Sequence, residues 1–197
     1  MEDNDIKRKV LKISVLGDTG VGKTSIINAF LNKNFQENTI SNIGSEKISK
    51  KMTMNDGNEM KILIWDTAGQ ERFRSIATST IKNSQGIVLV FDLTQKESFK
   101  HLPKWLEDIN NNGGETKILF GNKFDLLEKV EVSEKEAKEF AFENKMNYFS
   151  TSAKENVNIE EGFKEICQKA YENNKETIGM SLNDSGQKKN KIKKKCC

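Results

Sequence analysis

The chain of 197 residues is long enough for one α/β domain with a sizeable core and a short tail. Six lysines lie within residues 188–195, and they account for the formal net charge of +3. Without them the chain has 26 basic and 29 acidic residues, so the rest of the protein is weakly acidic. An acidic body argues against general nucleic-acid binding, and the sequence shows neither a secretory signal nor an apolar run near the roughly 20 residues of a membrane helix. We therefore expect a cytosolic protein that binds no nucleic acid.

The predicted elements alternate between strands and helices. In chain order they are strand 10–16, helix 25–30, a hairpin of 46–54 and 60–65 that turns at 55–57, strand 86–92, helix 98–110 with Pro103 near its first turn, strand 116–121, helix 134–144, strand 147–151 and helix 159–173. This alternation predicts an α/β fold with a six-stranded, mostly parallel sheet, helices on both faces and ligands at the carboxyl ends of the strands.

The composition divides the chain into one domain over residues 1–176 and a polar, lysine-rich tail over 177–197 that we expect to be disordered. The lysine run could be a solvated segment or contact nucleic acid, but beside the terminal Cys196 and Cys197 it is more typical of a tether to anionic lipid. Cys167 falls on an apolar helix face and is expected in the core. Because His101 is the only histidine and no cysteine pair has ligand spacing, we expect neither a zinc site nor a disulfide framework.

A glycine-rich segment, GDTGVGKT at 17–24, follows the first strand and opens the first helix. In this setting the pattern predicts a phosphate-binding loop, because its glycines let successive N–H groups point inward at a helix N-terminus. Lys23 would reach the β- and γ-phosphates and Thr24 would ligate Mg²⁺, while a plain glycine-rich turn is the alternative. The nucleotide-binding residues expected in this segment are Asp18, Thr19, Gly20, Val21, Gly22, Lys23, Thr24 and Ser25.

A second motif, WDTAGQ at 65–70, closes another apolar strand. Asp66 is expected there as a carboxylate that holds Mg²⁺ through a water ligand of the ion, and the Gly69 N–H can meet a γ-phosphate because glycine allows close backbone approach. Gln70 follows at a position from which it could orient an attacking water. We therefore predict Gln70 and Lys23 as the catalytic residues.

Two further motifs, NKFD and SAK, each end a later strand. Asp125 can accept hydrogen bonds from N1–H and N2–H₂ of guanine, a donor pair that adenine lacks. The Ala153 N–H can donate to guanine O6. Each short motif alone could be a plain turn, but four in order at strand ends predict a guanine-nucleotide site. The residues expected around the base are Asn122, which braces the loop, Lys123, which lies along the base, Asp125, Ser152, Ala153 and Lys154.

With these motifs the chain resembles the Ras-like small GTPases and, within them, the Rab family. The Rab-like segments are KILIW at 61–65, RFRSI at 72–76, LVFDLT at 89–94 and the terminal Cys-Cys after a basic linker. The resemblance implies a single P-loop GTPase domain that binds GTP or GDP with Mg²⁺. It also implies Phe35 packed edgewise against guanine, where an isolated Phe would be core, and geranylgeranyl groups on Cys196 and Cys197 as a two-chain anchor; an unmodified cysteine pair is the alternative.

The same resemblance implies a monomeric GTPase switch with slow intrinsic hydrolysis that regulates membrane trafficking. The implied partners are an exchange factor, a GAP, a GDI or escort protein, and effectors. The protein would cycle between the cytoplasm and the cytosolic face of an endomembrane compartment or the plasma membrane. An ATP-using P-loop enzyme is excluded by Asp125.

Switch I departs from the family pattern at Asn42, where the family has a threonine that ligates Mg²⁺. An asparagine oxygen can ligate the ion, but the side chain is longer and Mg²⁺ requires strict octahedral geometry. Thr39 or Ser41 could serve instead if the loop takes a different path. A membrane-tethered scaffold that binds GTP or GDP with weak hydrolysis or switching is therefore the alternative function.

The surface that partner proteins contact also departs from the family pattern. Lys47 replaces an aromatic residue and Thr80-Ile81 replaces a tyrosine pair, so Trp65 is the one aromatic left of the triad that Rab effectors contact. A lysine in a desolvated pocket is costly unless it is paired. We expect standard Rab effectors to bind poorly and a true effector to offer an acidic or polar patch.

Overall fold

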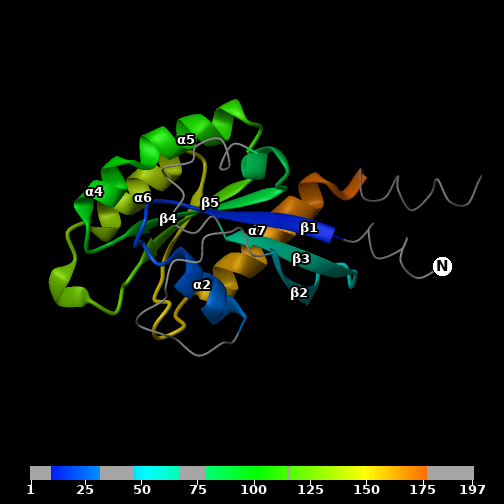
Figure 1. Cartoon of the computed structure of the whole chain (residues 1–197), viewed down its shortest axis with the longest axis horizontal. Helices are drawn as coiled ribbons and strands as arrows, with labels where there is room; N and C mark the ends of the chain where they lie inside the picture. The colour runs from blue at the N-terminus through cyan, green and yellow to red at the C-terminus, as the bar shows by residue number, and fades with distance from the viewer. Residues whose placement is uncertain (1–9, 32–46, 67–78, 115, 177–197) are drawn as a thin grey trace, which may run out of the picture.

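The computed structural model describes residues 10–31, 47–66, 79–114 and 116–176. Across these residues a six-stranded sheet lies at the centre, in the strand order β2-β3-β1-β4-β5-β6 (Figure 1). Its strands are β1 (Val10–Leu16), β2 (Lys47–Thr53), β3 (Glu59–Asp66), β4 (Gly86–Asp92), β5 (Lys117–Asn122) and β6 (Asn147–Ser150). Only β2 runs antiparallel, to β3, and the other pairings are parallel. The predicted α/β fold with a mostly parallel sheet is confirmed.

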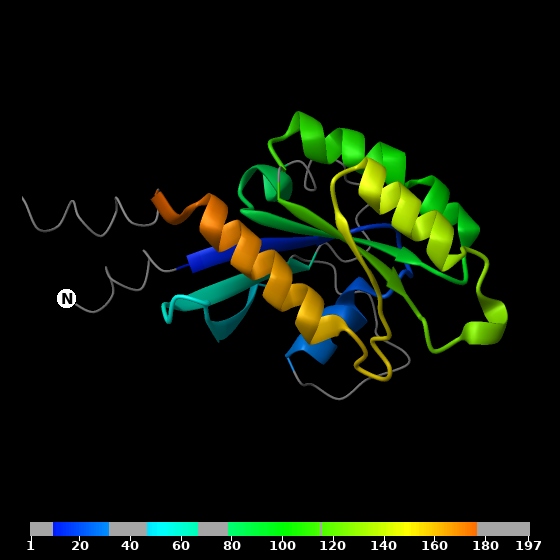
Figure 2. The same cartoon turned by 180° about the vertical axis from the view of Figure 1, so that it is seen from behind.

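Helices cover both faces of this sheet. They are α2 (Lys23–Phe30), α4 (Lys96–Lys100), α5 (Leu102–Asn111), α6 (Glu134–Glu143) and α7 (Ile159–Asn173), with a short 3₁₀ helix, η2 (Leu127–Lys129). The apolar sides of α2 and α7 share one core with the sheet, and those of α5 and α6 share the other. Figure 2 shows α7 crossing the first of these faces. All seven residues of β4 are buried, as expected for a central parallel strand covered on both sides.

The predicted helix 98–110 is wrong in one respect, since the structure has two helices that meet at His101. The ring of Pro103 lacks an N–H and clashes with a preceding turn of helix, so a helix cannot continue through it without distortion. Pro103 lies in the first turn of α5, as expected, and α4 is a separate helix of five residues before it. The break places His101 at the start of α5, facing the loop that follows β1.

The turn between β2 and β3 is joined to the end of α7 by side chains. Tyr171 Oη donates to Asp56 Oδ2 at 2.9 Å and Lys175 Nζ pairs with the same oxygen at 2.8 Å. Asn58 Nδ2 donates to Tyr171 Oη at 3.0 Å. The hydrogen bond from Lys175 is the main reason why the pKa of Asp56 lies well below its usual range. The start of β1, this turn and the end of α7 lie at one end of the domain (Figures 1 and 2).

Cys167 lies in the core on α7, as predicted, and burial raises the pKa of its thiol to about 12. In the parts of the chain that the structure describes, none of the helices has the length and apolar character needed to cross a bilayer.

Candidate functional site

The loop after β1 has the backbone conformation that its glycines allow. Gly17 has φ +143°, and a Cβ there would lie 2.1 Å from the Val90 carbonyl oxygen of β4. Gly22 has φ +97° and caps the N-terminus of α2. Lys23 folds back over the loop, donating from Nζ to the carbonyls of Gly17 at 2.7 Å and Asp18 at 2.5 Å. The loop therefore wraps around a buried ammonium at a helix N-terminus, an arrangement that attracts anions.

Two oxygen-bearing side chains meet beside this loop. Thr24 Oγ1 donates to Asp66 Oδ2 at 2.7 Å, which links the first turn of α2 to the end of β3. Asp66 is buried and Thr24 is half-buried. A hydroxyl and a carboxylate are hard oxygen ligands, and Mg²⁺ in nucleotide sites takes one or two such protein ligands together with phosphate oxygens. The donor set therefore fits Mg²⁺, with Thr24 as the side chain that would ligate the ion and Asp66 as the carboxylate that would hold it through water.

Asn122, at the end of β5, joins the glycine-rich loop to the loop after β6. Its Nδ2 donates to the Val21 carbonyl at 2.8 Å, and its Oδ1 accepts from the Ala153 N–H at 3.2 Å. The residue is 2% exposed, so both bonds lie away from water. Segments more than a hundred residues apart in the sequence are thereby fixed to one amide side chain.

The loop after β5 presents its charged side chains in fixed positions. Lys123 has φ +67°, a left-handed conformation that turns the chain sharply after the strand. Its Nζ lies 2.6 Å from Oδ2 of Asp92, a fully buried carboxylate at the end of β4. Ser152 Oγ donates to Asp125 Oδ1 at 2.7 Å. The carboxylate of Asp125 and the backbone of Ala153 are thus held on neighbouring loops at the same edge of the sheet.

Comparison with known proteins agrees with this geometry. The model of the Ras family matches residues 12–172. The Ras-related protein Rab-10 of Diplobatis ommata is 37% identical over 196 residues, covering 95% of this chain and 96% of that protein. The Ras-related protein Rab-13 of Rattus norvegicus is 37% identical over 161 residues, covering 81% of this chain and 79% of that protein. The chain is a Ras-like small GTPase of the Rab family.

In this Rab-family protein the structure brings most of the expected nucleotide-site residues to one edge of the sheet. The residues that carry the contacts described above are Asp18, Val21, Gly22, Lys23, Thr24, Asp66, Asn122, Lys123, Asp125, Ser152 and Ala153. Thr19, Gly20 and Lys154 are exposed on the same loops, and Ser25 is half-buried in the first turn of α2. Their roles toward a nucleotide remain predictions.

The other predicted site residues lie outside the described residues. They are Phe35, Asn42, Gly69, Gln70, Cys196 and Cys197. For Lys47 the structure gives the backbone, which lies at the start of β2 opposite Trp65.

One expectation about the partner-facing surface of this Rab-family member is wrong. Thr80 and Ile81 are 2% and 1% exposed, and Ile81 packs into the core shared with α5 and α6. The change from a tyrosine pair at these positions therefore alters packing within the domain, because neither side chain reaches the surface in this structure.

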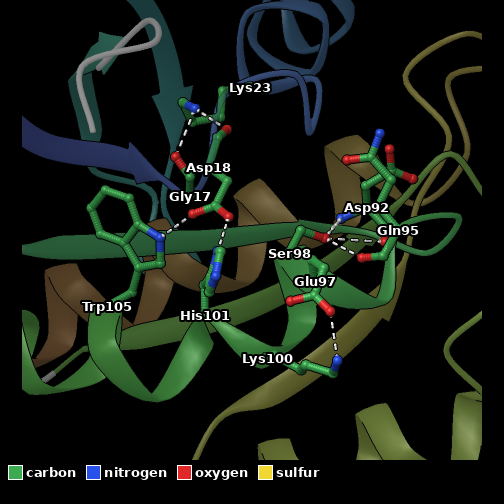
Figure 3. Close-up of polar contacts among 10 residues, drawn as sticks. All are labelled: Gly17, Asp18, Lys23, Asp92, Gln95, Glu97, Ser98, Lys100, His101 and Trp105. Atoms are coloured by element: carbon green, nitrogen blue, oxygen red, sulfur yellow. Dashed lines mark hydrogen bonds and ion pairs between the residues drawn. The ribbon is translucent and has the colours of Figure 1, made fainter. Parts of the chain in front are cut away.

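Two residues that touch the glycine-rich loop were missed at the sequence level. His101 Nδ1 lies 2.6 Å from Asp18 Oδ2, and Trp105 Nε1 donates to Asp18 Oδ1 at 2.8 Å (Figure 3). The available signal was their i, i+4 spacing, which places both side chains on one face of a helix. Their partner lies more than eighty residues earlier in the chain.

Proposed function

We propose that the chain is a GTP-binding and GTP-hydrolysing switch of the Rab type that regulates vesicle and membrane trafficking. The observation that carries the proposal is the position of Asn122, whose amide ties the phosphate-binding loop at Val21 to the base-recognition loop at Ala153. A bound guanine nucleotide would span these two loops. Family membership and the relatives named above support the same activity.

The reaction would be in-line attack of water on the γ-phosphoryl group. Lys23 would stabilise the negative charge that develops on the phosphate oxygens, and Gln70 would orient the water. When bound, Mg²⁺ would supply further charge neutralisation next to Thr24 and Asp66. The three arginines of the chain, Arg8, Arg72 and Arg74, lie outside the described residues. As the family resemblance implies, we expect intrinsic hydrolysis to be slow and a GAP to supply an arginine in trans.

The choice of guanine would depend on Asp125. Ser152 holds one of its carboxylate oxygens, which supports a fixed orientation toward the base. Xanthine carries a carbonyl where guanine carries its amino group, so an amide side chain at this position can donate to it. We expect Asp125→Asn to shift preference from guanine to xanthine nucleotides in competition binding, with Asp108→Asn, at a half-buried position on α5, as the matched control.

Switching would follow from the γ-phosphate ordering residues 36–47 and 68–81, which would relax after hydrolysis. Limited proteolysis of the GDP-bound and GTP-analogue-bound forms tests this, and equal cleavage across both segments would refute it. Exchange factor, GAP, GDI or escort protein and effectors would act on these segments. Geranylgeranyl groups on Cys196 and Cys197, with the lysine tail, would hold the protein on the cytosolic face of a membrane. Mass spectrometry of the chain from eukaryotic cells would show both modifications.

The deciding experiment is a titration of fluorescent GDP and of a fluorescent GTP analogue, first in Mg²⁺ and then in EDTA. We expect tight binding of both nucleotides in Mg²⁺ and strong weakening in EDTA. Tight GDP binding with feeble binding of the analogue, and little effect of Mg²⁺ on the latter, would refute the switch.

One specific residue favours a second candidate, a membrane-tethered scaffold that binds guanine nucleotide with weak hydrolysis. Asn42 stands where the family has its Mg²⁺-binding threonine. If the scaffold reading holds, Asn42→Thr should raise the single-turnover rate of GTP hydrolysis, while the matched control Asn38→Thr should not. A parent protein that hydrolyses GTP at a rate typical of the family and does not respond to Asn42→Thr would exclude the scaffold.

A further inference from the structure

The carboxylate of Asp18 is held by two side chains from another part of the fold. His101 Nδ1 lies 2.6 Å from Oδ2 and Trp105 Nε1 lies 2.8 Å from Oδ1, so each oxygen has its own nitrogen partner (Figure 3). An ionised carboxylate only accepts, so His101 Nδ1 carries the hydrogen in this contact. The Asp18 side chain is 23% exposed, which shields this contact in part from water.

The backbone of Asp18 and its side chain face different partners. Its carbonyl accepts from the Lys23 ammonium at 2.5 Å, which places the main chain of residue 18 at the group that would neutralise the β- and γ-phosphates. Its carboxylate points the other way, toward α5, as Figure 3 shows. Without these two partners the side chain is free to adopt another rotamer, one that turns its negative charge from α5 toward the phosphate end of the site.

Such a rotation would be unfavourable for nucleotide binding. Like charges a few ångströms apart in a partly desolvated site repel each other, and the repulsion grows as the local dielectric constant falls. The γ-phosphate adds negative charge at the end of the site where Lys23 meets residue 18. The penalty would therefore be larger for GTP than for GDP.

We propose that His101 and Trp105 are positioning residues that hold the Asp18 carboxylate away from the γ-phosphate and so set the relative affinity of the site for GTP and GDP. This inference rests on the proposed function. The inference also gives the break between α4 and α5 a role, because α5 starts at a position that directs His101 and Trp105 to the glycine-rich loop. The nearby pair of Glu97 and Lys100, at 2.5 Å, is exposed on α4 and does not contact Asp18.

The test compares the Kd for a GTP analogue with the Kd for GDP, both in Mg²⁺. The variants are His101→Ala with Trp105→Phe, the same pair in an Asp18→Ala background, and Asp18→Ala alone. Trp105→Phe keeps an aromatic ring on α5 but removes the indole N–H. Lys100→Ala is the matched control, since it removes a charged side chain next to His101 that has no contact with the loop.

We expect the His101→Ala, Trp105→Phe protein to lose about fivefold in GTP-analogue affinity relative to GDP, the effect of weakening a charged contact that is partly open to water. In the Asp18→Ala background the same two substitutions should not change the ratio of the two Kd values any further, so the triple variant should have the same ratio as Asp18→Ala alone. His101→Gln, which keeps an N–H donor, should return most of the parent ratio when Trp105 is intact. Lys100→Ala should leave the ratio unchanged.

The inference is overturned if the ratio does not change, or if the loss is as large without the Asp18 carboxylate as with it. The second result would mean that α5 acts on the site only through packing. A parent protein that fails to bind guanine nucleotides would instead refute the proposed function, so the two failures are distinguishable. A melting temperature close to that of the parent, measured without nucleotide, shows that each variant is folded, and His101→Ala alone is used if the double substitution lowers it.

Discussion

Replacing Asn122 by alanine should destabilise the domain and loosen the nucleotide site together. The substitution removes both hydrogen bonds of a 2% exposed amide and leaves the Val21 carbonyl and the Ala153 N–H buried without that partner. Each such buried polar group costs about 1–3 kcal/mol, so we expect a loss of about 3 kcal/mol in the free energy of unfolding. With an m-value of about 2 kcal/mol per molar urea, the midpoint should fall by about 1.5 M.

The assay is urea unfolding of the nucleotide-free protein, followed by the rate of fluorescent GDP release. Asn144→Ala is the matched control, because it removes one hydrogen bond, to the Phe140 carbonyl at 2.8 Å, at the far end of α6. We expect that control to cost less than about 1 kcal/mol and to leave GDP release unchanged. An Asn122→Ala midpoint within about 0.3 M urea of the parent would refute the reasoning, because two buried polar groups that lose their hydrogen-bond partner should lower the free energy of unfolding by more than that shift allows.

Three further predictions concern other parts of the domain. Gly17→Ala should lower the free energy of unfolding by about 3 kcal/mol or more, since its Cβ would lie 2.1 Å from a carbonyl oxygen of β4. Gly57→Ala is the control, because Gly57 has φ +84° but open space around it, and the same urea titration should show a clearly smaller loss. Equal losses for the two variants would contradict the steric argument. Burial that raises the thiol pKa of Cys167 to about 12 should protect it from alkylation at pH 8 in a protein whose two terminal cysteines are replaced by serine; rapid labelling without denaturant would disprove this. The hydrogen bond from Lys175 lowers the pKa of Asp56 from its ordinary 3.8, so the stability that this carboxylate contributes is present above that pH and is lost as the pH falls further. The difference in melting temperature between the parent and Asp56→Asn should therefore stay constant from pH 7 to 5 and narrow below pH 3.8. A difference that stays constant down to pH 2.5 would be inconsistent with the pairing.

Local patterns were sufficient to predict much of the fold. The strands at 10–16 and 86–92 and the helix at 159–173 have the predicted bounds, because buried apolar runs and a sustained helical period are encoded by neighbouring residues. Helix α6 begins one residue after Ser133, whose side chain forms a capping box with Glu136. The division of α4 from α5 was not predicted, since Pro103 can start a helix without showing where the preceding one ends.

The candidate site could be predicted as a set of motifs but not as a network of contacts. Residue type and spacing indicated Lys23, Thr24 and Asp66, and the structure brings them to one edge. The pairs of Asp18 with His101 and of Asp92 with Lys123 could not be foreseen, because they depend on how β1, β4 and β5 align in the sheet. Register of this kind is a property of the whole fold, and a single sequence gives no direct signal for it.

The contacts of Asp56 with Tyr171 and Lys175 also bear on how the domain would respond to a pull on its C-terminal end. The glycine-rich loop follows the carboxyl end of β1, whereas this cluster lies at the opposite end of the domain, where α7 finishes (Figures 1 and 2). A load applied to the chain beyond residue 176 would pass first into α7 and the β2–β3 turn. The nucleotide edge lies at the other end of the sheet from the point where such a pull enters the domain.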